Sequence, residues 1–108
     1  MIDKDIKKEI LNLESLLGYQ DGSVVSRALI NKDVGTVTLF SFDKEEGLSE
    51  HTAPFDALAY IFDGEAKITI LNEDFILSKG QMIIMPANQP HALKAIEKFK
   101  MMLIMIKS

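Results

Sequence analysis

The stretch that decides the fold is "GQMIIMPANQPHALKA", residues 80–95. An apolar run, "QMIIM", precedes five residues of turn chemistry, "PANQP", and His91 follows directly. Proline fixes its own backbone angle, and asparagine tolerates the left-handed conformation that a tight turn requires. The stretch therefore predicts a strand that ends in a sharp turn, with a histidine at its exit. The chain has two histidines, and the other is His51.

The same alternation of short apolar runs and turn residues continues over most of the chain after Gly22. The runs are rich in β-branched and aromatic residues, which favour strands. They recur at roughly 8–12-residue intervals, a spacing typical of a β-sandwich or β-barrel. We therefore expect an all-β fold whose strands include residues 24–30, 35–42, 58–62, 66–71, 75–78, 81–85 and 99–106.

The first 22 residues have a different pattern. Apolar side chains in "MIDKDIKKEILNLESLLG" recur at steps of three or four, which is the spacing of one helix face. Asp3 is a suitable N-cap and Gly18 a suitable stop. We expect a short amphipathic helix, or a helix plus a turn, that presents Ile2, Ile6, Ile10, Leu13 and Leu17.

Composition limits the function. The 108 residues suffice for a single domain over 1–108, with an appendage over 1–22 and a β-barrel over 24–106. The net charge of −4 and the scattered lysines argue against nucleic-acid binding, and the absence of cysteine excludes disulfides and thiolate chemistry. The chain shows no signal peptide, and its longest apolar run is far shorter than the ~20 residues of a membrane helix. We expect a cytoplasmic protein.

The run "ALAYIF", residues 57–62, is apolar on both faces of the strand that it predicts. A domain of this size buries one interior, so the second apolar face indicates contact between subunits. We expect a homodimer, and cover by the N-terminal helix is the alternative. One face carries Ala57, Ala59 and Ile61, and the other carries Leu58, Tyr60 and Phe62.

Residues 80–95 resemble the second motif of the cupins, G-x5-P-x-G-x2-H-x3-N. Gly80, Pro86 and His91 stand at the spacings of that motif. Asn88 occupies the place of its second glycine, and Ala95 replaces its final asparagine. Asparagine is a plausible substitute because it also accepts a left-handed backbone.

Residues 51–64 resemble the first cupin motif, G-x5-H-x-H-x3–4-E-x6-G. His51 and Gly64 match it, whereas Ala53 stands at the second histidine position and Ala57 at the glutamate position. The leading glycine is displaced to Gly47. The resemblance covers roughly residues 24–106 and implies a double-stranded β-helix, or jelly-roll, barrel with a pocket at its mouth.

In cupins, two histidines and a glutamate of the first motif and one histidine of the second typically hold a divalent metal. Carried over position by position, His51 and His91 remain. Catalytic metal sites usually keep about three protein ligands, so two imidazoles alone predict weak binding. Asp56 points away from the cavity in a regular strand, and a bulge near Pro54 would be needed to turn it inward.

These residues suggest two functions. The first is a small-molecule-binding cupin without a firmly held metal, acting as a binding or sensing module or as a modest acid/base catalyst. Its pocket would be lined by His51, His91, Ala53, Ala57 and Ala59. The second is a metal-dependent enzyme, of dioxygenase or isomerase type, in which the histidines bind Fe, Mn, Ni or Zn. Asp56, substrate or water would complete that shell.

Two further interpretations stay open. The histidines equally suit plain polar residues that line a cavity which once held a metal. A stand-alone relative of the sensory cupin domains of transcription factors ranks last, because the chain is acidic and predicts no helix-turn-helix.

Overall fold

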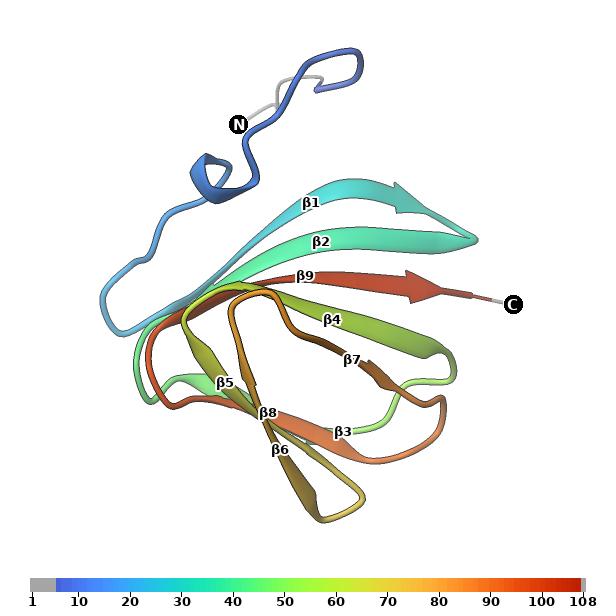
Figure 1. Cartoon of the computed structure of the whole chain (residues 1–108). Helices are drawn as coiled ribbons and strands as arrows, with labels where there is room; N and C mark the ends of the chain where they lie inside the picture. The colour runs from blue at the N-terminus through green and yellow to red at the C-terminus, as the bar shows by residue number, and fades with distance from the viewer. Residues whose placement is uncertain (1–5, 108) are drawn as a thin grey trace.

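The protein, seen in a computed structural model that describes residues 6–107, is built almost entirely of antiparallel strands. Within that range nine strands form two sheets, with the orders β1-β2-β9-β4-β7 and β3-β8-β5-β6 (Figure 1). The predicted all-β jelly-roll barrel is confirmed. In chain order the strands are β1 (Val24–Lys32), β2 (Gly35–Phe42), β3 (Gly47–His51), β4 (Asp56–Asp63), β5 (Glu65–Ile70), β6 (Glu73–Ser78), β7 (Met82–Met85), β8 (His91–Ala95) and β9 (Phe99–Ile106).

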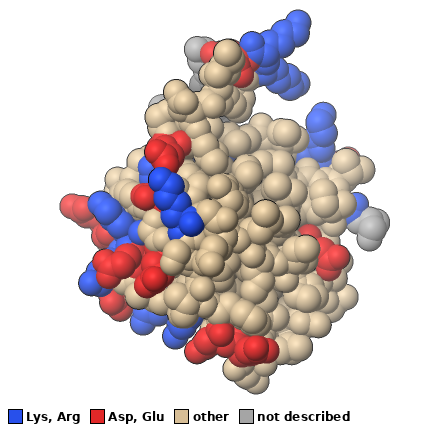
Figure 2. Space-filling view, in the orientation of Figure 1, with Lys and Arg blue, Asp and Glu red and all other residues tan. Residues whose placement is uncertain are grey.

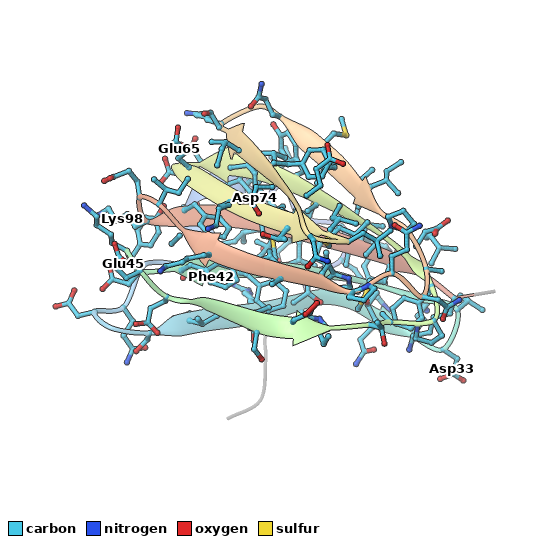
Figure 3. All side chains as sticks on the ribbon, turned by 90° about the horizontal axis from the view of Figure 1, so that it is seen from below. Asp33, Phe42, Glu45, Glu65, Asp74 and Lys98 are labelled. Carbon is cyan, nitrogen blue, oxygen red and sulfur yellow. The ribbon has the colours of Figure 1, made fainter. Side chains whose placement is uncertain are left out.

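The core lies between the two sheets and takes one face of each strand. Burial alternates along β5, where Ala66 and Ile68 are fully buried, as the two-residue period of a strand requires. Phe42 and Phe99, paired across β2 and β9, stack with ring centroids 4.4 Å apart. Figure 3 shows Phe42 between the sheets, whereas Glu45 points outward.

Two of the motif residues owe their identity to backbone conformation. Gly64, between β4 and β5, has φ +76°, and a Cβ at this position would overlap the carbonyl oxygen of Lys98. The two strands therefore turn tightly against the loop that precedes β9. Asn88 has φ +64°, which confirms that asparagine here occupies the left-handed conformation expected of the motif glycine.

The helix predicted in the N-terminal segment is wrong. One 3-10 turn, η1 (Leu13–Ser15), is present there, and Ile2 and Asp3 lie outside the described residues. The segment instead crosses the outer face of the first sheet, and three side chains of that sheet donate hydrogen bonds to its backbone. The bonds run from Lys100 Nζ to Glu14 O (2.9 Å), from Arg27 Nη1 to Leu16 O (2.7 Å) and from Ser41 Oγ to Gly18 O (2.8 Å).

These contacts explain why the helical pattern does not produce a helix. An isolated helix of this length is marginal in water, and the bonds from the sheet hold the segment in the conformation observed. Leu17 instead packs with Leu39 and Phe62 in a second apolar cluster outside the barrel. Tertiary contacts therefore override the local periodicity. No helix within residues 6–107 has the length and apolar content to cross a membrane.

The N-terminal segment covers part of the outer face of β4. Cover by this segment was the alternative to a subunit contact that the sequence left open. Phe62 is 3% exposed beneath it, whereas Leu58 and Tyr60, on the same face, stay partly exposed. The inner face carries Ala57, Ala59 and Ile61, all buried. Part of the outer face therefore remains uncovered.

Candidate functional site

The two histidines meet at one end of the second sheet. His51 is the last residue of β3 and His91 the first of β8, and the two are directly paired across these antiparallel strands. Their ring centroids lie 4.4 Å apart and the rings meet edge to face at 66°. Strand pairing therefore brings together the histidines of the two sequence motifs.

Each ring is held by the same local bond. Nδ1 of His51 lies 2.8 Å from the carbonyl oxygen of Ser49, and Nδ1 of His91 lies 3.2 Å from that of Gln89. A carbonyl oxygen only accepts, so each neutral ring carries its proton on Nδ1 and keeps a lone pair on Nε2. The pair therefore presents two hydrogen-bond acceptors from a fixed tautomer.

The two rings differ in their access to water. His51 is exposed at the barrel rim, whereas His91 is 6% exposed beneath it. Burial lowers the pKa of His91 below the usual 6.5, a nearby positive charge on His51 lowers it further, and the bond to Gln89 opposes both effects. His91 is therefore a neutral imidazole at physiological pH.

Apolar side chains surround the buried ring. Ile70 pairs with His91 across β5 and β8 and is 8% exposed, and Leu93 lies two residues further along the same face. Ala57, at the glutamate position of the first motif, faces the interior from the opposite sheet. Its partners across β7 and β9 are Met85 and Met105, so flexible methionines flank the small residue.

The structure does not bring Asp56 to the histidines. Its side chain is exposed, and its Oδ1 accepts a hydrogen bond from the amide of Ala87 (2.8 Å). The register shift in this region falls between Leu48 and His51, ahead of the histidine rather than at Pro54. Asp56 therefore anchors the loop between β7 and β8.

The remaining donors do not fit a resident metal. Among the described residues, no group of three or more His, Asp or Glu side chains is placed to hold a metal ion. Two imidazole nitrogens fall short of the roughly three protein ligands of a typical catalytic site. The ligand set that the cupin resemblance implies is therefore not assembled by these residues.

Backbone contacts that the sequence did not reveal organise the site. The amide of Asn88 donates to the carbonyl of Ala53 (2.7 Å), and this bond ties the loop of one motif to that of the other. Ser49 and Gln89, each two residues before a histidine, orient the two rings. The sequence could not reveal these contacts, because a residue's side-chain type does not show what its backbone carbonyl binds. The one shared feature is that each carbonyl lies two residues before its histidine. Ala59, which is 0% exposed, lies two residues beyond Ala57 on the same inner face of β4.

The comparisons with known proteins agree with this architecture. The family described as "Cupin domain" matches residues 38–107. A conserved protein of unknown function from Streptococcus pyogenes is 36% identical, with 97% of this chain and 93% of that chain covered and a TM-score of 0.91. A cupin superfamily protein from Desulfitobacterium hafniense is 32% identical, with 94% of each chain covered and a TM-score of 0.89.

A cupin 2 conserved barrel domain protein from Leptotrichia buccalis is 43% identical over 90% of this chain, with a TM-score of 0.87. This chain covers 47% of that protein. No curated protein matches the chain. Two antiparallel sheets closed over one apolar interior, with a histidine pair at its end, define a small jelly-roll barrel. With the family match over most of its length, the chain belongs to the cupins.

Proposed function

We propose that the protein binds a small, partly apolar organic molecule at the His51–His91 end of the barrel, without a firmly held metal. The observation that carries this proposal is the matched anchoring of both Nδ1 atoms on backbone carbonyls. It fixes two Nε2 acceptors side by side at the edge of an apolar interior. Small-molecule sites typically combine such an apolar wall with a few convergent polar groups.

The chemistry of the pair defines the ligand class. Two neutral imidazoles accept hydrogen bonds, so the ligand should carry hydroxyl or N–H donors beside its apolar part. His91 is buried, and its lowered pKa keeps its Nε2 free to accept a hydrogen bond or a proton, whereas His51 at the rim contacts solvent. If the ligand is a substrate, His91 would accept a proton from it and His51 would exchange that proton with water. We further propose a cytoplasmic location.

A thermal-shift screen of small hydroxylated and N–H-bearing compounds tests the proposal. Compounds that raise the Tm would then be titrated against His51→Leu, His91→Leu and the double variant. Each substitution replaces the imidazole with an apolar side chain of similar size. Loss of one hydrogen bond, worth about 0.5–1.5 kcal/mol, should weaken binding by about 2- to 13-fold for each histidine.

A matched control separates binding from stability. Leu39→Val changes a fully buried residue of the second apolar cluster, outside the barrel, and should lower stability without changing the affinity. The proposal fails if the double histidine variant binds the hits as tightly as the wild type.

The second candidate is a metal-dependent enzyme of dioxygenase or isomerase type. The two Nε2 lone pairs favour it, and the missing third ligand opposes it. Elemental analysis of protein purified without affinity tag or chelator decides the question, alongside the variant His51→Ala/His91→Ala. Near-stoichiometric Fe, Mn, Ni or Zn that disappears in the variant would replace our first proposal, whereas equal background metal in both proteins would support it.

A further inference from the structure

A cavity of about 510 Å³ lies between the N-terminal segment and the outer face of the first sheet. Tyr60 and Phe62 line it from β4, residues 12–15 line it from the segment, and Lys79 lines it from the turn between β6 and β7. Ala59, next to Tyr60 in the chain, is buried on the opposite face of β4. The strand therefore separates this cavity from the interior of the barrel and from the histidine pair.

An ion pair joins two sides of the cavity. Lys79 Nζ lies 3.1 Å from Glu14 Oε1, and each of the two side chains is 65% exposed. Both backbones are anchored, because Lys100 Nζ donates to the carbonyl of Glu14 and the amide of Gly80 donates to the carbonyl of Ile61 (2.7 Å). An ion pair this exposed contributes little to stability. Its two charges are therefore held in place by the fold but are free to take other partners.

The charges around the pair are of both signs. The hydrogen bond to Glu14 and the charge of that carboxylate raise the pKa of Lys79, and Asp63 adds to this effect. Figure 2 shows acidic and basic side chains intermingled at the left of the face in view, below the N-terminal segment. A ligand with a single charge would meet a like charge in this pair, which is unfavourable. A ligand with one positive and one negative group matches both members.

We propose that this cavity binds a free α-amino acid with an apolar side chain. The carboxylate of the amino acid pairs with Lys79 and its ammonium group pairs with Glu14, so two charge-assisted contacts replace one. The two charged groups of an α-amino acid are attached to one carbon, and their close spacing suits the short Lys79–Glu14 separation.

The remaining lining suits the side chain of such a ligand. Tyr60 is partly exposed and packs with Leu13 against the buried Phe62, so the cavity offers an aromatic ring on an apolar support. Aromatic rings pair favourably with one another, which favours phenylalanine among the apolar amino acids. The volume also falls within the roughly 300–1,000 Å³ of small-molecule sites. This site is independent of the function proposed for the histidine pair.

Isothermal titration calorimetry of the full chain with L-phenylalanine tests the proposal. We expect a dissociation constant of about 1 mM or below. Phenylpropanoate, which lacks the ammonium group, and phenylethylamine, which lacks the carboxylate, should each bind at least about fivefold more weakly. A wild type that does not bind L-phenylalanine, or that binds all three compounds equally, overturns the proposal.

Two variants and a matched control test the ion pair itself. Lys79→Met and Glu14→Gln should each weaken the binding of L-phenylalanine at least about fivefold. Lys44→Met is the control, because Lys44 and Glu97 form a similarly exposed pair (3.5 Å, 58% and 60% exposed) away from the cavity. Equal effects of Lys79→Met and Lys44→Met would exclude a specific role for Lys79.

The histidine pair is a competing location, because L-phenylalanine also carries N–H donors. The double variant His51→Leu/His91→Leu should therefore bind L-phenylalanine as tightly as the wild type. In ¹⁵N-resolved NMR spectra, the ligand should shift the amide signals of residues 13–15, Tyr60 and Lys79 and leave those of residues 91–95 in place. Loss of binding in the histidine variant, with binding retained in Lys79→Met, would place the ligand in the barrel and overturn the proposal.

Discussion

The substitution Gly64→Ala should be among the most damaging single-methyl changes in this barrel. Gly64 has φ +76°, and the left-handed conformation costs a residue with a Cβ roughly 1–2 kcal/mol. The new Cβ would also overlap the carbonyl oxygen of Lys98, which is backbone and has little freedom to move. Overpacking of this kind costs about 1–3 kcal/mol more. We expect a total loss of about 2–5 kcal/mol, out of the roughly 5–15 kcal/mol typical of a domain.

Two other glycines isolate the two contributions. Gly80 has φ +90° but open space around its Cβ position, so Gly80→Ala should show the conformational cost of roughly 1–2 kcal/mol alone. Gly18 has open space and no positive φ, so Gly18→Ala should gain about 0.4–1 kcal/mol. Urea unfolding at pH 7 measures all three. Equal losses for Gly64→Ala and Gly80→Ala would refute the role assigned to Lys98.

Three further predictions concern local strain and pH. Leu71, in the β5–β6 turn, has φ +49°, and Leu71→Asn should stabilise the protein by about 0.5–1 kcal/mol in the same unfolding assay; no gain would show that the turn is not strained. The pKa of His91 is lowered by burial, so the unfolded chain binds the proton more readily. Stability should fall as the pH drops from above 6.5 through the folded pKa, and His91→Gln should flatten that loss; an unchanged slope in the variant would contradict it. The pKa of Tyr19 is raised by burial and then by the bond to Asp63, so stability should fall as the pH rises above 10; Tyr19→Phe should remove this alkaline loss, and its persistence would exclude Tyr19 as the source.

Much of the fold could be predicted because strand period and turn chemistry are local. The spacing from Gly80 to His91 requires a strand, a tight turn and a second element, and Asn88 takes the backbone conformation that its residue type suggested. The N-terminal segment could not be predicted in this way. Its helical period is real, but Arg27, Ser41 and Lys100 hold its backbone against the sheet, and those residues reach it only after the sheet has formed.

The sequence predicted which two histidines form the candidate site, but not how their rings are oriented or what surrounds them. Two motifs named His51 and His91, and their direct pairing follows from the strand order. The position of Asp56 depends on a hydrogen bond to Ala87, and sequence alone does not reveal it. The carbonyl contacts that fix both rings depend equally on backbone geometry, which no side-chain identity encodes.

The most direct test of the account is ¹⁵N NMR of the two imidazole rings at pH 7, with and without a compound found by thermal shift. Because the chain has two histidines, single variants assign every ring nitrogen. We predict that both free rings are protonated on Nδ1 and that the compound shifts both Nε2 signals while the Nδ1 signals stay in place. Rings protonated on Nε2, or Nε2 signals that no stabilising compound moves, would contradict a binding site built on this pair.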